Sequence, residues 1–330
     1  MKLTFCRLTF ALALVLLAAG CVSMRSRPVS PLASASSVFE FALIGDMPYD
    51  KAQATKFFPN MIEELNAASL AFVVHDGDIK AGSTPCTDEL FERIKTQFQT
   101  LRHPLIYVFG DNEWSDCGEV KTNAFDPQER LEKLRDMFTQ GNESLGQTTL
   151  ELKRQSDDSR FAAYRENVRW SRDGVVFAGL NVPGNDNHFE TTEFAARNAA
   201  NIAWIHEAFA LAKRDDARAV MLVMQANPHF DLASTNKLRL GFNEMLKVIE
   251  EKTLTFKKPV VLVHGDSHYF RIDQPLLGAK SKRRIENFTR VETFGNPDMH
   301  WIRVSVDASD PNVFRFYPQY VQKNRLKHNR

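Results

Sequence analysis

Short apolar runs alternate with amphipathic segments in the first third of the chain. The runs at 38–44, 70–75 and 104–109 have the length of buried strands, and a Gly-Asp step follows each of them. Between them, 51–67 and 88–101 carry apolar residues at the spacing of one helix face. This alternation is typical of βαβ units, so the pattern predicts a parallel sheet.

The second half of the chain continues the alternation and adds hairpins. Residues 168–180 form two apolar arms around an Asp-Gly pair and predict a β-hairpin. The other elements show the same apolar spacing and are expected as helices at 192–214 and 241–251, strands at 219–224 and 259–263, and a closing hairpin at 301–306 and 313–317. The pattern therefore predicts a layered α/β fold without an internal repeat of fixed period.

The N-terminus carries the pattern of an export signal. Lys2 and Arg7 come before an apolar run that is too short to span a bilayer, so 1–20 is expected to be a signal peptide. The small residues before Cys21 resemble the lipobox of bacterial lipoproteins, which implies lipid on Cys21, a membrane anchor and a periplasmic location. Ordinary signal cleavage is the alternative, because Ala18 stands where lipoboxes usually carry leucine.

Composition divides the rest of the chain. Residues 21–37 are rich in Ser, Pro and Ala and predict a flexible tether, 38–320 a folded domain, and 321–330 a basic tail. With 43% apolar and 25% charged residues, the chain can bury a full core. A net charge of +1 gives no electrostatic signature of nucleic-acid binding.

Two cysteines remain for the folded domain. Signal cleavage removes Cys6 and lipidation uses Cys21, which leaves Cys86 and Cys117. A pair of cysteines in an oxidising compartment predicts a disulfide, and this one would join two loops that follow Gly-Asp steps. Two buried free thiols are the alternative.

Four Gly-Asp steps carry the candidate chemistry: Gly45-Asp46, Gly77-Asp78, Gly110-Asp111 and Gly265-Asp266. In open α/β sheets, ligands bind where the carboxyl ends of the strands meet, and a carboxylate there is a hard oxygen ligand for a cation. One such step is more often a turn or a helix cap. Four of them at predicted strand ends indicate a metal-binding site.

The last step lies between two histidines. His264, Asp266 and His268 alternate, so an extended chain projects them to one side and a turn can gather them around one ion. Imidazole with carboxylate suits zinc, iron or manganese. The alternative is structural, with the histidines bonded to backbone groups.

These motifs resemble those of the calcineurin-like metallophosphoesterases over roughly 38–317. That family has Asp-x-His after its first strand, Gly-Asp after the second, Gly-Asn-His-Asp/Glu after the third, a lone histidine later and Gly-His-x-His near the end. The resemblance implies a four-layer α/β/β/α sandwich with two metal ions, bridged by the aspartate of the second motif. It also implies hydrolysis of phosphate esters.

The resemblance assigns roles residue by residue. Asp46 matches the first motif, Asp78 the bridging carboxylate, and Asp266 and His268 the two histidines of the last motif. Asp111 matches the metal-binding asparagine and Asn112 the catalytic histidine, although a shift by one residue would make Asn112 the ligand. The implied metal ligands are Asp46, Asp78, Asp111, Asn112, Gln225, Asp266 and His268.

The departures from the family are at histidines. Pro48 replaces the histidine of the first motif, Asn112 the catalytic histidine, and Gln225 or Asn227 the lone middle histidine. Tyr49 could supply a phenolate oxygen beside Pro48. Candidate replacements elsewhere are His188, His229 and His300, and His75 could orient a ligand from behind.

The sequence therefore predicts an exported enzyme that hydrolyses a small phosphate ester with two divalent or trivalent ions of iron, manganese or zinc. With the usual acid missing, His264 or a metal-bound water would protonate the leaving group, or activated esters would be preferred. The alternative is a non-catalytic, lipid-anchored binding or scaffold protein that kept the fold and lost the histidines.

Overall fold

The apolar runs of the first third form one sheet. In the computed structural model, which describes residues 38–325, β1 (Phe39–Ile44), β2 (Val73–His75) and β3 (Leu105–Tyr107) run parallel. β11 (Trp301–Val306) and β12 (Phe314–Gln319) extend this sheet antiparallel, in the order β12-β11-β1-β2-β3. The predicted signal peptide, Cys21 and the tether lie outside the described residues, as do the last residues of the tail.

The later strands form a second sheet of seven strands, in the order β4-β5-β6-β7-β8-β10-β9. Its strands are β4 (Lys153–Arg154), β5 (Val168–Arg172), β6 (Val175–Gly179), β7 (Ala219–Val223), β8 (Val260–His264), β9 (Arg271–Asp273) and β10 (Phe288–Glu292). The central strands β6, β7, β8 and β10 are parallel, and β5 with β6 is the predicted hairpin around Asp173-Gly174.

Strand β1 shows why the two sheets pack face to face. Phe39, Phe41 and Leu43 point into a core shared with β6, β7 and β8 of the other sheet, whereas Ala42 and Ile44 face the helices. This is the alternation expected of a strand that is buried on both faces. The stacked rings of Phe41 and Phe72 meet Phe177 edge-on across the interface between the sheets.

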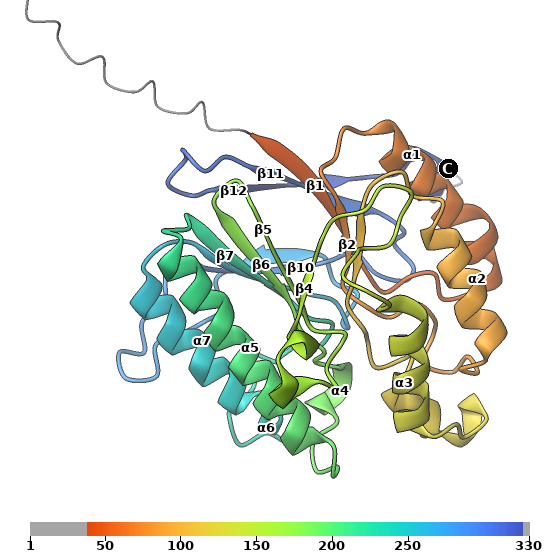
Figure 1. Cartoon of the computed structure of the whole chain (residues 1–330), viewed down its shortest axis with the longest axis horizontal. Coiled ribbons are helices and arrows are strands. Elements are labelled where there is room, and N and C mark those ends of the chain that lie inside the picture. Colours follow the sequence, from red (N-terminus) through yellow and green to blue (C-terminus); the bar gives the residue numbers. More distant parts are fainter. Residues whose placement is uncertain (1–37, 326–330) are drawn as a thin grey trace, which may run out of the picture. The chain divides into compact units, whose positions relative to one another are not determined.

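Helices cover the outer face of each sheet (Figure 1). α1 (Phe58–Ala67), α2 (Asp88–Phe98) and α3 (Pro127–Phe138) pack on the five-stranded sheet, and α5 (Phe194–Arg214) and α7 (Asn243–Phe256) pack on the seven-stranded sheet. The layers are therefore helix, sheet, sheet and helix, which confirms the predicted α/β/β/α sandwich. None of the helices in residues 38–325 has both the length and the apolar character needed to cross a bilayer.

The remaining elements are short. They are the π-helical turn η1 (Gln53–Phe57), the helices α4 (Gly184–Asn187) and α6 (Lys237–Leu240), and the 3₁₀ turns η2 (Ser115–Gly118), η3 (Val120–Thr122), η4 (Gln155–Asp157), η5 (Ser159–Phe161) and η6 (Gln322–Asn324). The predicted helix 51–67 thus begins with a π turn, and helix α7 runs further than predicted, to Phe256.

Candidate functional site

The Gly-Asp steps place four carboxylates at the carboxyl ends of parallel strands from both sheets. Asp46 follows β1, Asp78 follows β2, Asp111 follows β3 and Asp266 follows β8. Asp46, Asp78 and Asp266 adopt left-handed backbone conformations with φ of 49°, 58° and 74°. Aspartate tolerates this region better than most residues, and such conformations concentrate at functional sites.

Close approach explains one of the glycines. A Cβ atom on Gly110 would lie 2.1 Å from Asp78 Oδ1 and 2.9 Å from Gln225 Cγ. Only a residue without a side chain lets β3 end this close to the carboxylate that follows β2. Gly110 therefore sets the distance between two of the strand ends that form the site.

A first group of side chains meets around the hydroxyl of Tyr49. This hydroxyl donates to Asp78 Oδ2 at 2.9 Å, lies 3.0 Å from His268 Nε2 and is 3.4 Å from Asp46 Oδ1. His268 Nε2 is 3.7 Å from Asp46 Oδ1. Asp46 in turn accepts the backbone N–H of Asp266, at 3.1 Å from each carboxylate oxygen. Residues from three loops thus converge on one point.

A second group contains Asp111, Asp266 and Gln225. Asp111 Oδ1 and Asp266 Oδ1 flank Gly184, where a Cβ atom would lie 2.5 Å from the first and 2.7 Å from the second. Asp111 Oδ2 accepts a hydrogen bond from Asn185 Nδ2 at 3.1 Å, but buried Asp111 Oδ1 has no hydrogen-bond partner among the described residues. The buried side-chain amide of Gln225 lies beside Asp266, where hydrogen bonding to the carboxylate acts to lower the pKa of that acid.

Asn112 is a hydrogen-bond donor to two members of the first group. Its Nδ2 donates to Asp78 Oδ2 at 2.7 Å and to the Tyr49 hydroxyl at 3.1 Å. Its backbone N–H donates to Asp78 Oδ1 at 3.2 Å. The amide nitrogen of Asn112, which the sequence resemblance matches to a catalytic histidine, therefore faces Asp78 and Tyr49.

Glu113 holds the strand ends in register. Its carboxylate accepts the backbone N–H groups of Asp78, Ile79 and Gly110, at 3.2, 3.3 and 2.6 Å. It also accepts the hydroxyl of Tyr107 at 2.7 Å. Sequence reasoning missed this role, although the signal was present as an acidic residue two positions after Asp111. Glu113 positions Asp78 rather than facing the cluster.

The buried aspartates of the cluster have too little positive charge nearby to keep their usual pKa values. Burial, and then the neighbouring carboxylates, raise the pKa of Asp46, Asp78 and Asp111 well above the usual range. Burial is also the main cause of the raised pKa of Asp266. Buried acids of one sign are stable only when protonated or when a cation neutralises them.

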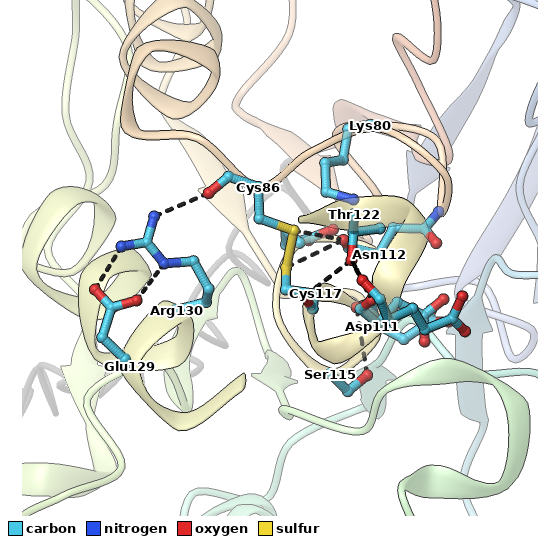
Figure 2. Close-up of a disulfide and its surroundings, with 12 residues drawn as sticks. Lys80, Cys86, Asp111, Asn112, Ser115, Cys117, Thr122, Glu129 and Arg130 are labelled. Carbon is cyan, nitrogen blue, oxygen red and sulfur yellow. Dashed lines mark hydrogen bonds and ion pairs between the residues drawn. A yellow bond between two sulfur atoms is a disulfide. The ribbon is translucent and has the colours of Figure 1, made fainter. Parts of the chain in front are cut away.

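The predicted disulfide between Cys86 and Cys117 is confirmed, so the free-thiol alternative is wrong. Both sulfur atoms lie 3.7 Å from the carbonyl oxygen of Asn112. Figure 2 shows the bridge beside Asp111 and Asn112, with Arg130 donating to the carbonyl of Cys86 at 2.9 Å. The bridge therefore fastens the loop after β3 to the segment before α2.

His264, Asp266 and His268 do not gather around one point. Ser267 N–H donates to Gly265 O at 3.0 Å, and this turn separates the three side chains. His264 is buried, with Nδ1 2.9 Å from Gly265 O and Nε2 3.9 Å from Glu292, and burial lowers its pKa to about 3. The structure thus places His264 beside Glu292 and not with the cluster, and its Nε2 has no hydrogen-bond partner among the described residues.

The other predicted histidines have structural contacts. His188 Nδ1 lies 2.8 Å from Glu193, His229 Nε2 lies 3.1 Å from Asn185 O, and His300 packs edge-on against Phe294 and Tyr320. His75 does lie behind the cluster: its Nδ1 accepts from Gly77 N, and its Nε2 is 3.0 Å from Met47 O.

The two amides considered for the middle histidine have different surroundings. Asn227 binds the loop itself, since its backbone N–H donates to Asp266 Oδ2 at 3.0 Å and its side chain donates to Ser267 at 2.6 Å. The side chain of Gln225 instead faces the cluster, between Gly77 and Gly110 and beside Asp266. Of the two, Gln225 is better placed for a ligand.

The donor atoms fit metal binding only when residues other than histidine, cysteine and acids are included. In residues 38–325, no group of three or more His, Cys, Asp or Glu side chains is arranged to hold an ion. Tyr49 and Gln225 extend the two groups beyond those types. Bonds of about 2.0–2.2 Å to one ion place neighbouring ligand atoms roughly 3 Å apart. The Tyr49 contacts with Asp78 and His268, at 2.9 and 3.0 Å, have this spacing.

Comparison with known proteins supports the fold. No protein-family model and no curated protein matches the chain. Among solved structures, PhoD matches with a TM-score of 0.51 and 10% identity, over 84% of this chain and 66% of PhoD. GAP50, the anchor in the inner membrane complex of Plasmodium, matches with a TM-score of 0.48 and 11% identity, over 86% of this chain and 89% of its own.

The purple acid phosphatase PPD1 of yellow lupin seeds matches with a TM-score of 0.47 and 13% identity, over 86% of this chain and 54% of its own. The chain therefore spans about half of the plant enzyme and about two thirds of PhoD. At these sequence identities the similarity concerns the fold alone. Only the match to PhoD, with a TM-score above 0.5, is used to support the fold. The protein has a mixed α/β sandwich fold of the metallophosphoesterase type.

Proposed function

We propose that the protein is a metal-dependent hydrolase of phosphate esters. The observation that carries this proposal is the group of buried carboxylates at the carboxyl ends of parallel strands, in which Asp111 Oδ1 has no partner among the described residues. Burying such groups is unfavourable unless a cation or a proton compensates them. Perturbed titratable groups that cluster at strand ends are typical of functional sites.

Two ions would have separate ligand sets joined by one carboxylate. Asp46, Tyr49 and His268 would hold the first ion together with Asp78. Asp78 would also hold the second ion, together with Asp111, Gln225 and Asp266 of the second group. Carboxylate, phenol and imidazole together suit iron, manganese or zinc better than calcium.

The chain's own residues would orient the reaction. When bound, two such ions activate water and neutralise the charge on the phosphoryl group. Asn112 Nδ2 donates its two hydrogen atoms to Asp78 and to the Tyr49 hydroxyl and would orient these two ligands. An amide cannot release a proton at neutral pH. The protein should therefore favour esters whose leaving group departs without protonation, such as aryl phosphates.

A non-catalytic binding or scaffold protein is the second candidate. The observation that favours it is the set of replacements at the family's histidine positions, where Pro48, Asn112 and Gln225 now stand. Such a protein would keep the sandwich and the disulfide but would bind no metal at Asp78. The two candidates therefore differ in metal content.

The deciding experiment compares metal content and hydrolysis in matched variants. Asp78→Asn keeps the shape of the side chain and removes its charge, and Asp136→Asn makes the same change where the side chain is 66% exposed on α3. Each protein is loaded with manganese, iron or zinc, analysed by mass spectrometry and assayed on aryl phosphate mono- and diesters. We expect metal and activity in the wild type and in Asp136→Asn, and a loss of both in Asp78→Asn. Metal content that does not depend on Asp78, with no hydrolysis, would favour the scaffold.

We also propose that the chain is exported and anchored to the membrane by lipid on Cys21, with 38–320 as the phosphoesterase domain. The disulfide supports export, because such bonds persist in oxidising compartments. In a bacterial host, Cys21→Ala should move the protein from the membrane fraction to the soluble periplasm. A wild type that is already soluble there would indicate ordinary signal cleavage.

A further inference from the structure

A pocket of about 410 Å³ adjoins the first group of the site. It lies between the segment that follows β1 and helix α2, and its lining includes Tyr49 and the buried Lys80. The hydroxyl of Tyr49 is the point on which Asp46, Asp78 and His268 converge. A molecule whose phosphoryl group occupied the site could therefore extend into this pocket past Tyr49.

Part of the pocket wall is apolar. Pro48, Leu90 and Ile94 line it, and all three are buried side chains. A surface of this kind holds an organic group rather than a second hydrated ion, because transfer of apolar area from water drives the contact. The pocket is thus suited to the carbon skeleton of an ester.

Three cations line the same pocket. Lys80 is buried, and its Nζ donates to the carbonyl of Ala81 at 3.1 Å, so an ammonium with three donors has capacity to spare. Lys51 and Arg93 are exposed at the outer end and form no ion pair among the described residues. The acid that lines the pocket, Asp50, accepts the backbone N–H of Gln53 at 2.8 Å. The pocket therefore has an excess of positive charge.

We propose that this pocket binds the organic group of the phosphate ester and selects one with an anionic substituent, a carboxylate or a second phosphate, at its far end. The phosphoryl group would lie on the carboxylate cluster, the apolar body on Pro48, Leu90 and Ile94, and the substituent at Lys51 and Arg93. This inference names the substrate class of the proposed hydrolase and rests on that function. Lys51 and Arg93 act as specificity-determining residues, because they contact the substituent and not the reacting atoms.

A second cationic pocket supplies the control. Lys213, Lys252 and Lys258 line it at the ends of α5 and α7, next to the starts of β7 and β8 and thus at the edge opposite to the site. Lys213→Ala removes one exposed cation there, as Lys51→Ala does beside the site. The net charge of the protein falls equally in the two variants. A difference in their substrate preference is therefore due to the position of the removed cation.

The kinetic experiment compares phenyl phosphate with 4-carboxyphenyl phosphate on the metal-loaded mature protein. We expect a higher kcat/KM for the carboxylated ester in the wild type and in Lys213→Ala. Lys51→Ala and Arg93→Ala should each lower this preference roughly three- to fivefold, the size of an exposed ion pair, and the double variant about tenfold. Arg93→Lys, which keeps the charge, should retain most of it. An equal preference in the wild type and the double variant would overturn the proposal.

A binding experiment separates failure of the pocket from failure of the proposed function. Phenylphosphonate and 4-carboxyphenylphosphonate, which are not hydrolysed, are titrated calorimetrically into the same proteins. Tighter binding of the carboxylated probe that depends on Lys51 and Arg93 supports the pocket even if no ester is hydrolysed. Hydrolysis without any such preference in kinetics or binding rejects the pocket and leaves the hydrolase.

Discussion

The hydroxyl of Tyr49 donates a hydrogen bond to Asp78 Oδ2 at 2.9 Å across 29 positions of sequence. The same hydroxyl lies 3.0 Å from His268 Nε2. Tyr49 follows Pro48, the residue that the sequence resemblance matches to a histidine ligand. An oxygen donor therefore reaches the cluster from the neighbouring position.

Removing that hydroxyl tests its part in metal binding. Tyr49→Phe keeps the ring and its edge-on packing on His268, so the fold should be retained. If the oxygen ligates or orients the ligands of one ion, metal affinity should fall by about 10–100-fold. Competition with a chelator of known affinity measures this change. Tyr317→Phe, at a side chain on the exposed edge strand β12, is the control, and equal affinities in the two variants would contradict the role.

Asp111→Asn should stabilise the metal-free protein by about 1 kcal/mol at neutral pH. Burial, and next the charge of Asp266, raise the pKa of Asp111, and its Oδ1 has no partner among the described residues. A carboxyl whose folded pKa is raised costs no stability below its unfolded pKa, and the cost grows as pH rises until it is complete above the folded pKa. The gain should therefore be larger at about pH 8 than at about pH 5.

Urea unfolding in the presence of a chelator measures the effect of Asp111→Asn. Asp231→Asn, where the side chain is 74% exposed, serves as the control and should change little. Added metal should stabilise the wild type more than the variant, because one anionic ligand is missing in the variant. A destabilised metal-free variant would show that the carboxylate is compensated by the protein itself.

The sequence predicted most strands and helices because their apolar patterns were uninterrupted. It failed at β10, where Arg290 and Glu292 lie within a buried strand. Their charges are neutralised by Asp273 and Arg271, residues that come from β9. Hydrophobic periodicity cannot predict these ion pairs, because they depend on which strand becomes the neighbour of β10 in the sheet.

The site was predictable where chemistry and local sequence coincide. The Gly-Asp steps and the cysteine pair indicated the loops that meet. The alternation of His264, Asp266 and His268 was misleading, because left-handed residues at Asp266 and His268 break the extended chain. The role of Glu113 could not be predicted, since its partners are backbone groups brought together only by the sheet.

Loss of the disulfide should lower the free energy of unfolding by about 3–4 kcal/mol. The bond closes a loop with a sequence separation of 31, and that closure restricts the unfolded chain. Urea unfolding of the oxidised wild type and of Cys86→Ser/Cys117→Ser gives the difference. Hydrolysis should fall as well, because both sulfurs contact the carbonyl of Asn112. A reductant should affect the wild type and leave the double variant unchanged.

Glu193 should make the loop beside Asp111 sensitive to acid. Burial alone would raise its pKa, but hydrogen bonding to His188 and Arg197 outweighs burial and holds the pKa at about 2. The unfolded value is about 4.3. Because the folded pKa is depressed, this stabilisation is complete above about pH 4.3 and is lost as pH falls toward 2.

Glu193→Gln should therefore cost about 2 kcal/mol at neutral pH, after allowance for partial solvent screening, and almost nothing below about pH 2. Unfolding by urea at a series of pH values measures the slope. Glu63→Gln, at a side chain that is 68% exposed, should not change it. If the free energy of unfolding depended on pH in the same way in the wild type and in Glu193→Gln, ionisation of Glu193 would not stabilise the fold.

Asn112→His should widen the range of esters that the protein hydrolyses. Asn112 donates to Asp78 and Tyr49 but has no proton to give a leaving group. An imidazolium at this position can protonate an alkoxide, a contribution of about 10²–10⁴-fold in favourable geometry. We expect kcat/KM for an alkyl phosphate to rise at least tenfold relative to an aryl phosphate, with the aryl rate little changed.

Asn112→Leu separates this gain from simple loss of the amide. It removes the same hydrogen bonds without adding a proton donor, so both esters should react more slowly and their ratio should stay as in the wild type. Circular dichroism and metal content establish that each variant is folded and loaded. An unchanged ratio in a folded, metal-loaded Asn112→His would mean that the leaving group takes its proton from elsewhere, so that the amide at 112 serves only to orient Asp78 and Tyr49.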